Sequence, residues 1–376
     1  MNEATLIQSS AGVPATVPHA APVSVRRWLL CVWALILCMV VIGGITRLTG
    51  SGLSIVDWKP LSGAIPPLSQ ADWLEVWGRY QHSPQYRDVN HWMTLGDFKR
   101  IFFWEYLHRL VGRAVGVVVF VPWLYFVARR RLPRVLAWKT LGLFALGGLQ
   151  GLLGWYMVES GLVNEPRVSH FRLAAHLLLA FTTGQLVLWL ALDAYFPRGR
   201  ARALRRSRLA PIAALLGLLV VQVCYGAFMA GTHAGYYYAT FPDMNGAYAP
   251  GPFFTGPSAL QDALNSPMAI HWLHRAFAFA LLFGSIGIWA YLRRVEPRPA
   301  LTRAAGLLAA LVFVQVNLGA FTVVRHVEIV FAAAHQAMAY VLVSGAVLLL
   351  HRALGSGQAL PATTHHTKRS PNNQTP

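Results

Sequence analysis

The chain has 376 residues, of which 55% are hydrophobic and only 12% are charged, and its mean hydropathy is +0.45. These values exclude an ordinary soluble globular protein and are typical of a membrane protein with several spans. The formal net charge of +18 could indicate a nucleic-acid partner, but the distribution of the basic residues along the chain argues against one.

Eight apolar segments are long enough to cross a bilayer, because a spanning helix needs about 20 mainly apolar residues. Residues 1–24, before the first segment, lack the basic start and apolar run of a signal peptide, and we expect a disordered tail there. We also expect the polar residues 353–376 to be disordered. The predicted spans cover residues 28–48, 103–127, 137–158, 169–192, 209–231, 270–292, 304–324 and 329–351.

The basic residues lie in alternate connections between these spans. They precede the first span at Arg26 and Arg27 and recur at 129–139, 198–208 and 293–303. On the opposite side, the loop at 232–269 contains no Lys or Arg. This positive-inside pattern predicts a multi-pass protein of the cell (inner) membrane with both termini in the cytoplasm. Topology and contact with anionic lipid explain the net charge, so we expect membrane lipid and no nucleic acid as a partner.

An internal repeat divides the membrane region into two halves. EYLHR at 105–109 matches HWLHR at 271–275, and the sequence around Gln150 resembles the sequence around Gln315. Four spans return the chain to the same side of the membrane, so the two repeats run parallel. The predicted fold is an all-α integral membrane protein whose eight transmembrane helices form two pseudo-symmetric four-helix bundles.

The predicted domains follow from this repeat. We expect the first bundle at 25–192 and the second at 209–352, joined by a basic cytoplasmic linker at 193–208.

Four histidines lie inside predicted spans at duplicated positions, His108 and His176 in the first half, and His274 and His335 in the second. We call them the histidine quartet. An imidazole in hydrocarbon is costly, so each needs a partner such as a metal or another side chain. The members of a pair are expected at similar depth on different helices, each within a few residues of the external helix end. That arrangement suits an iron porphyrin held from both faces. A lone membrane histidine more often only forms a hydrogen bond, but four in duplicated positions favour ligation.

Position 105 distinguishes the halves, because Glu105 stands where the second half has His271. The E-x-x-H spacing of Glu105 and His108 also occurs in di-iron carboxylate bundles. The chain has only 14 acidic residues, nearly all in predicted loops, so we expect no metal other than porphyrin iron. A carboxylate beside an apolar cavity can accept a proton near neutral pH, which predicts chemistry in the first half alone. The alternative is a glutamate that only favours the start of its helix.

Three further residues lie next to the quartet and are predicted to support it. His271 is one helical turn from His274 on the same face, and we expect it to bond a porphyrin carboxylate. Arg109 and Arg275 each follow a quartet histidine. They either pair with porphyrin propionates or extend to the lipid headgroups.

At these residues the chain resembles the heme A synthase family, over about residues 28–351. The first external loop lacks the cysteine pair that some members carry, so the chain is more similar to the proteobacterial and mitochondrial branch. The motifs that carry the resemblance are GGITRLTGSGLSIVDWKPLSGAIPP (43–67), EYLHRLVGR (105–113), QGLLGWYMVESGL (150–162), HWLHR (271–275) and AAHQ (333–336).

The resemblance implies an oxidoreductase acting on a CH3 group, with heme O as its substrate. Two successive water-derived hydroxylations would convert the C8 methyl group of heme O into a formyl group, giving heme A for cytochrome oxidase. The resemblance implies that Glu105 is the catalytic carboxylate and that His108 and His176 are axial ligands of the substrate heme. It implies that His274 and His335 ligate the iron of a resident heme b.

The resemblance also suggests candidate partners, namely heme O synthase (the farnesyltransferase) and cytochrome oxidase assembly factors. It places the heme sites toward the periplasmic side. The electron acceptor and a homo-oligomeric state stay open. The alternative from another class is a bis-histidine b-type membrane cytochrome that carries electrons between quinol and an external acceptor; a heme transporter is a second one. Glu105 and the family motifs argue against both.

Overall fold

The structure is a computed structural model, and it describes residues 21–59, 62–163, 166–196, 203–249 and 255–355. Within these residues the regular structure is helical, and eight helices are long and apolar enough to cross a membrane. The predicted all-α membrane fold with eight spans is therefore confirmed. The eight are α1 (Val23–Leu48), α3 (Leu95–Ala128), α4 (Arg134–Glu159), α5 (His170–Tyr195), α6 (Arg206–Gly231), α8 (Pro267–Val295), α9 (Pro299–Val324) and α10 (Ile329–Ala353).

Shorter helices occupy the connections after α1 and α6. The first connection contains a 3-10 turn, η1 (Ser62–Ala64), the helix α2 (Gln70–Gln81) and a π turn, η2 (Tyr86–Asn90). The second contains η3 (Ala234–Tyr236) and α7 (Ala259–Asn265).

Most of the spanning helices extend beyond the predicted segments. The largest extension is in α3, which begins at Leu95 rather than 103 because Thr94 and Asp97 form a capping box. The Thr94 hydroxyl accepts from the Asp97 N–H, and the Asp97 carboxylate accepts from the Thr94 N–H. An apolar window marks only the hydrocarbon-spanning part of a helix, so it misses polar turns that lie outside it.

The same effect moves the predicted domain boundaries. α1 begins at Val23 and α10 ends at Ala353, so both expected tails overlap helix ends. The predicted linker at 193–208 also overlaps the end of α5 and the start of α6. The rest of both tails, residues 1–20 and 356–376, and the middle of the linker, 197–202, lie outside the described residues.

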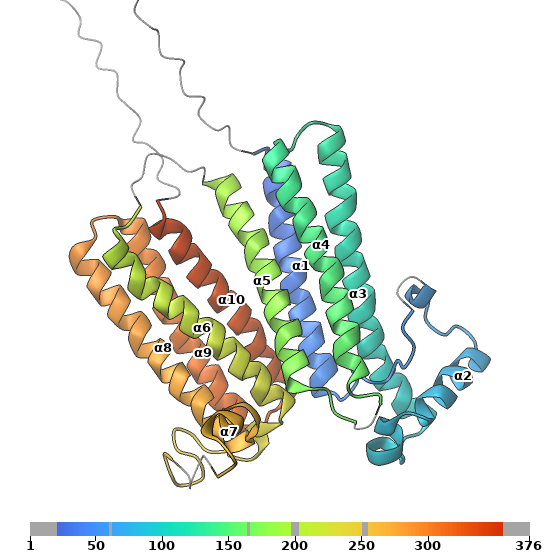
Figure 1. Cartoon of the computed structure of the whole chain (residues 1–376). Helices are drawn as coiled ribbons and strands as arrows, with labels where there is room; N and C mark the ends of the chain where they lie inside the picture. Colours follow the sequence, from blue (N-terminus) through green and yellow to red (C-terminus); the bar gives the residue numbers. More distant parts are fainter. Residues whose placement is uncertain (1–20, 60–61, 164–165, 197–202, 250–254, 356–376) are drawn as a thin grey trace, which may run out of the picture.

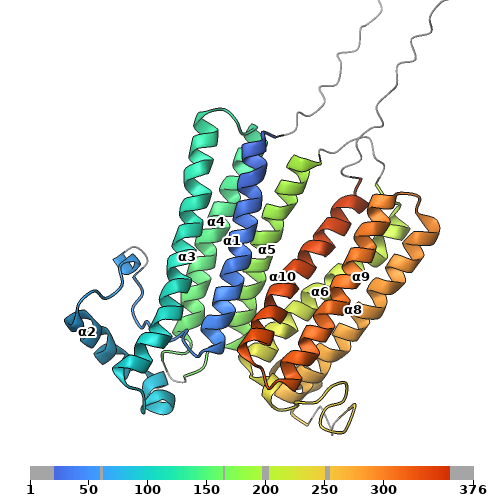
Figure 2. The same ribbon diagram turned by 180° about the vertical axis from the view of Figure 1, so that it is seen from behind.

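The spanning helices form two groups of four (Figures 1 and 2). α1, α3, α4 and α5 contact one another in the first group, and α6, α8, α9 and α10 do so in the second. α1 begins and α10 ends at the same end of the molecule, while α2 and α7 lie at the other end (Figure 1). We call this other end the α2–α7 end. It is the end that the charge pattern predicts to face outward.

The two groups meet through α1 and α5 on one side and α6 and α10 on the other. Gln336 of α10 donates from Nε2 to the backbone carbonyl of Val40 at 2.9 Å, where it packs against Gly44 of α1. The Tyr340 hydroxyl, one turn along α10, donates to the carbonyl of Trp33 at 3.3 Å. Small residues and interhelical hydrogen bonds are how membrane helices associate, because lipid provides no hydrophobic driving force between them.

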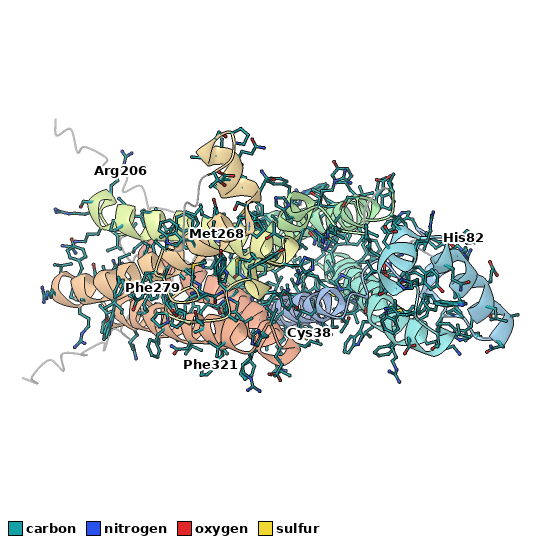
Figure 3. All side chains as sticks on the ribbon, turned by 90° about the horizontal axis from the view of Figure 1, so that it is seen from below. Cys38, His82, Arg206, Met268, Phe279 and Phe321 are labelled. Carbon is teal, nitrogen blue, oxygen red and sulfur yellow. The ribbon has the colours of Figure 1, made fainter. Side chains whose placement is uncertain are left out.

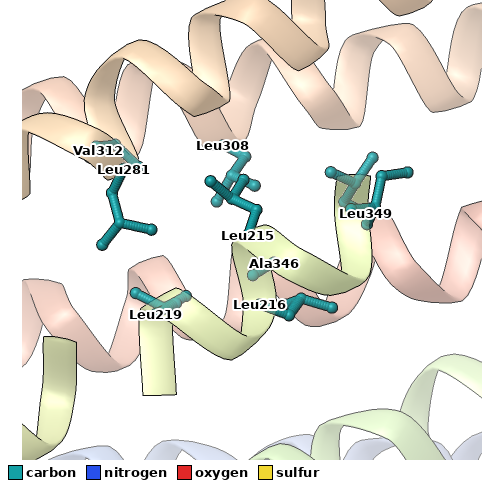
Figure 4. Close-up of a pocket in the computed structure, with 9 residues that line it drawn as sticks. Leu215, Leu216, Leu219, Leu281, Leu308, Val312, Ala346 and Leu349 are labelled. Atoms are coloured by element: carbon teal, nitrogen blue, oxygen red, sulfur yellow. The ribbon is translucent and has the colours of Figure 1, made fainter. Parts of the chain in front are cut away.

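Aliphatic side chains fill the interior of the second group away from the α2–α7 end. Leucines of α6, α8, α9 and α10 form one buried cluster there, with a small apolar cavity between them (Figure 4). The cavity has no polar lining, so it is a packing feature. The residues that line it are Ile212, Leu215, Leu216, Leu219, Leu281, Leu308, Val312, Ala346 and Leu349.

The connection between α1 and α3 forms a small aromatic lobe beside α3. Tyr80, Phe98 and Phe102 are its buried centre, and Trp73 and Trp77 pack around them. Seen from the α2–α7 end, His82 of this lobe lies at the outer edge of the first group, far from Met268 in the second (Figure 3). The lobe therefore packs against α3 in the first group and does not extend over the second group.

Candidate functional site

The quartet histidines of the first group each pack their rings against a glycine. A Cβ on Gly43 of α1 would lie 2.9 Å from Cε1 of His108 on α3. A Cβ on Gly154 of α4 would lie 3.0 Å from Cε1 of His176 on α5. Both distances are shorter than side chains tolerate without a shift, so only glycine leaves room for these rings.

The second group repeats this arrangement on corresponding helices. A Cβ on Gly226 of α6 would lie 3.5 Å from Cε1 of His274 on α8. A Cβ on Gly319 of α9 would lie 2.9 Å from Cε1 of His335 on α10. Each half thus pairs its first helix with its second, and its third with its fourth, through one glycine and one imidazole.

The structure brings the two members of each predicted pair together. His108 lies close enough to His176 to interact with it electrostatically, and the same holds for His274 and His335. The Nδ1 atoms of His108 and His274 are buried and have no hydrogen-bond partner among the described residues.

The depth of one histidine differs from the prediction. His108 was expected close to the external end of its helix, but it lies about three and a half turns after Leu95, the first residue of α3. The capped polar turns that precede the apolar part of α3 account for the difference. The other three lie within about two turns of their helix starts, as expected.

Two glutamines hold the second histidine of each pair. Gln150 donates from Nε2 to the backbone carbonyl of His176 at 3.0 Å and lies 3.1 Å from its Nδ1. Gln315 donates to the carbonyl of His335 at 3.1 Å and also lies 3.1 Å from Nδ1. A side chain that contacts both the ring and the backbone of a histidine restricts the orientation of its imidazole.

Glu105 is buried on α3 and held by the loop that follows α1. Its Oε2 accepts hydrogen bonds from the Ser54 hydroxyl and the Ile55 N–H, both at 2.8 Å. Its Oε1 lies 2.7 Å from the guanidinium of Arg109, one turn further along α3. Glu105 lies three residues before His108, on the same helical face. A carboxylate in a defined position therefore stands beside the first histidine pair.

Arg109 fastens the same loop to α3. Its guanidinium donates to the carbonyls of Ile55 at 2.9 Å and Asp57 at 3.0 Å, in addition to its ion pair with Glu105. Arg113, one turn further, donates to the carbonyl of Lys59 at 2.9 Å. Backbone carbonyls near hydrocarbon need such donors, because water does not reach them there.

In the second half an arginine contacts the corresponding loop in the same way, and His271 stands where the first half has Glu105. Arg275 donates to the carbonyls of Asp243 and Thr240 in the loop after α6, at 2.6 and 2.9 Å. Its Nε donates to Nε2 of the buried His271 at 3.0 Å. The structure thus places Arg109 and Arg275 against loop carbonyls. It places His271 next to Arg275, at the position that Glu105 occupies next to Arg109 in the first half.

The comparisons with known proteins agree with the motifs. The family model of cytochrome oxidase assembly proteins matches residues 26–347. The chain belongs to this family. It is similar to the heme A synthase of Nitrosomonas eutropha, with 43% identity over 330 residues, 87% of this chain and 91% of that protein.

Two further heme A synthases are equally similar. The protein of Nitrosospira multiformis is 43% identical over 326 residues, 86% of this chain and 92% of the relative. The protein of Maricaulis maris is 44% identical over 322 residues, which are 85% of this chain and 93% of the relative. The predicted membership of the heme A synthase family is therefore confirmed. The assignment to the branch without loop cysteines stays a prediction.

Sequence reasoning did not assign roles to several residues of the site. The glycines behind the histidine rings, Gly43, Gly154, Gly226 and Gly319, were not assigned a role. Gln150 and Gln315 were noted as repeat markers, and their equivalent positions in the two halves were the signal that could have assigned them. Ser54 carried no such signal, because its contact with Glu105 joins residues 51 positions apart.

Proposed function

We propose that the protein is a heme A synthase, an oxidoreductase that converts the C8 methyl group of heme O into a formyl group. The observation that carries the proposal is Glu105, a buried carboxylate beside one of two histidine pairs that are otherwise built alike. Support comes from the heme A synthases that are 43–44% identical to this chain and that match it over most of their length.

We propose the first half as the substrate site. His108 and His176 present imidazoles from different helices, and His108 has a buried ring nitrogen without a hydrogen-bond partner among the described residues, which leaves that nitrogen free to bind iron. The glycines behind both rings leave space beside the helix backbones. These residues would bind heme O through its iron and position its C8 methyl group in the first group of helices.

The residues of the second half fit a resident heme b in the same way. His274 also has a buried, unpartnered Nδ1, and His335 is held by Gln315 against Gly319. His274 and His335 would be the axial ligands, with His271 and Arg275 behind them. When bound, such a group supplies reversible one-electron chemistry.

Glu105 would act on the reacting carbon. Conversion of a methyl group and one water into a formyl group releases four electrons and four protons, through an alcohol and then a geminal diol that loses water. Positive charge develops at the methyl carbon as electrons leave. Both oxygens of Glu105 already accept contacts from Ser54, Ile55 and Arg109. Glu105 is therefore better suited to stabilise the positive charge at the carbon as a fixed negative charge than to act as a freely rotating base.

The alternative, a b-type cytochrome that carries electrons between quinol and an external acceptor, would use the same two histidine pairs. It does not account for a buried Glu105 held by three donors beside one pair only.

Extraction of pigments tests the proposal. Cells that supply heme O and express the chain should yield heme A, identified by its formyl-bearing mass, whereas cells without the chain should yield only heme O. Heme O unchanged in mass, with the protein present in the membrane, would contradict the enzyme and favour an electron carrier or a transporter.

Gly319→Ala is expected to lower the heme b content of the purified protein, because the new methyl group would meet the His335 ring at 2.9 Å. The measurement is the low-spin heme absorbance per protein. The matched control is Gly287→Ala on α8, where an added Cβ meets nothing within 4 Å. An alanine in a helix is intrinsically more favourable than glycine, so the control should keep its heme. Equal heme content in both variants would reject the proposed position of His335.

The setting of the reaction is part of the proposal. We place the protein in the inner membrane with both heme sites toward the periplasmic side, at the α2–α7 end. Heme O synthase is the proposed source of substrate, and cytochrome oxidase assembly factors are the proposed recipients of heme A.

A further inference from the structure

Arg47 occupies the last turn of α1 and has no hydrogen bond or ion pair with any residue that the structure describes. It is partly buried, and it interacts electrostatically with Tyr236 of η3. Arg47 lies four residues after Gly43, the glycine behind His108, and so on the same face of α1. Its position on α1 is therefore one turn from the glycine that backs the first histidine pair, toward the α2–α7 end.

A histidine and a second arginine from other parts of the chain lie in the same region. His233, just after α6, is within electrostatic range of both Arg47 and Arg167, which lies in the connection between α4 and α5, and burial and these two arginines lower the pKa of His233. His233 is consequently neutral at neutral pH and keeps one N–H to donate. Arg167 has no hydrogen bond or ion pair within the described part of the chain either. Two guanidinium groups without a hydrogen bond or ion pair in the described residues thus both approach His233.

The backbone at His233 adds an independent observation. His233 has φ 57, in the left-handed region that favours glycine and that, among other residues, Asn, Asp and His enter most often. The structurally equivalent residue after α1 is Gly50, with φ 66. The preceding residues show that the two positions are equivalent. The hydroxyls of Thr49 and Thr232 each donate to the backbone carbonyl four residues earlier, at 2.8 Å in both cases. A histidine where the other half has glycine indicates a role for its side chain.

The two halves differ at Arg47 as well. The alignment that pairs Gly43 with Gly226 pairs Arg47 with Ala230, so the second half has no cation at this position. A cation near a helix C-terminus is favoured by the helix dipole, but the dipole does not explain why like charges gather from separate segments. Other arginines at this end, such as Arg109 and Arg275, have carbonyl partners. Within the described residues this cluster has no anionic partner, so it is suited to bind an anion from outside the chain.

We propose that Arg47, with Arg167 and His233, binds a propionate carboxylate of the heme O held in the first half. This inference rests on the proposed function and names the part of the substrate that these residues recognise. Guanidinium groups bind carboxylates through two parallel hydrogen bonds, which would orient the porphyrin as well as hold it. The phosphate of an anionic lipid shares this chemistry, so the experiment must separate the two sources.

The test is an absorbance titration of the purified full-length protein, in neutral detergent, with heme O and with heme O whose propionates are methyl esters. The wild-type protein should bind the free acid more tightly than the ester. Arg47→Gln should bind the free acid about ten- to a hundredfold more weakly, as expected for the loss of a hydrogen-bonded charge pair, and should no longer distinguish acid from ester. Arg47→Lys should retain part of the preference.

Controls separate the proposal from instability and from lipid binding. Arg27→Gln, an exposed arginine at the other end of α1, should titrate like the wild type. Heme b absorbance from the second half reports folding of each variant, and Arg167→Gln provides a second substitution should Arg47→Gln fail to fold. A repeat with added phosphatidylglycerol tests the lipid phosphate as the bound anion.

Three results would overturn the proposal. They are full acid–ester discrimination in both Arg47→Gln and Arg167→Gln, equal weakening for acid and ester, and a loss of affinity that appears only when phosphatidylglycerol is present. A wild-type protein that discriminates acid from ester but forms no heme A would leave this inference standing and reject the proposed function instead.

Discussion

Glu105→Gln is expected to reduce heme A formation by at least about a hundredfold while heme O stays bound. Glutamine has nearly the same shape and keeps one oxygen that accepts from Ser54 and Ile55, but it removes the negative charge that faces Arg109. The histidines that would hold the porphyrin are unchanged. Chromatography of extracted pigments measures the product, and heme absorbance of the purified variant measures the bound substrate.

Glu75→Gln on α2 is the matched control. Glu75 is an exposed glutamate of the aromatic lobe, with its side chain 68% exposed and a weak ion pair to Arg79, and it is remote from the histidine pairs. The control should form heme A at the wild-type rate. Unchanged heme A output from Glu105→Gln would reject the role assigned to Glu105. Loss of bound heme from that variant would instead assign Glu105 to binding.

His274→Ala is expected to release heme b and abolish its low-spin absorbance, whereas His108→Ala should leave that absorbance intact and lose heme O instead. Each substitution removes one of two proposed axial nitrogens, and a single remaining imidazole does not give a bis-histidine spectrum. Absorbance and pyridine hemochrome analysis of the purified variants measure both pigments separately.

His91→Ala provides the control, since His91 is an exposed histidine in the connection before α3. It should retain both pigments. Survival of the full low-spin absorbance in His274→Ala would show that the ligand assignment is wrong. Loss of both pigments from His108→Ala as well as from His274→Ala would show that the two halves do not bind heme independently.

The positions of the eight spans and the duplicated histidines could be read from the sequence because both signals are local. A hydrocarbon layer requires an uninterrupted apolar run, which leaves a trace in every window of the chain. Duplication aligns His108 with His274 and His176 with His335 without any knowledge of contacts. Helix ends were less accurate, since the capping box at Thr94 and Asp97 extends α3 through polar residues that no apolar window includes.

The partners of the charged residues could not be read in the same way. Arg109 had two expected roles, pairing with propionates or extending to headgroups, and the structure shows it on the carbonyls of Ile55 and Asp57. Arg47 attracted no attention in the sequence, because a basic residue in the last turn of a helix is ordinary. Only the structure shows that Arg47 lies near Tyr236 and His233 of the second half and has no hydrogen-bond partner for its side chain among the described residues.

The sequence by itself determined that this is an eight-span helical membrane protein of the cytochrome oxidase assembly family, with four histidines in two equivalent pairs. Hydropathy and internal repetition encode those properties residue by residue. Only the tertiary structure decided which glycine each imidazole packs against, that Ser54, Ile55 and Arg109 hold Glu105, and that the Arg47 side chain has no hydrogen-bond partner in the part of the chain that the structure describes. Those contacts join segments far apart in the chain, and their geometry arises from helix packing, which no local pattern of residues specifies.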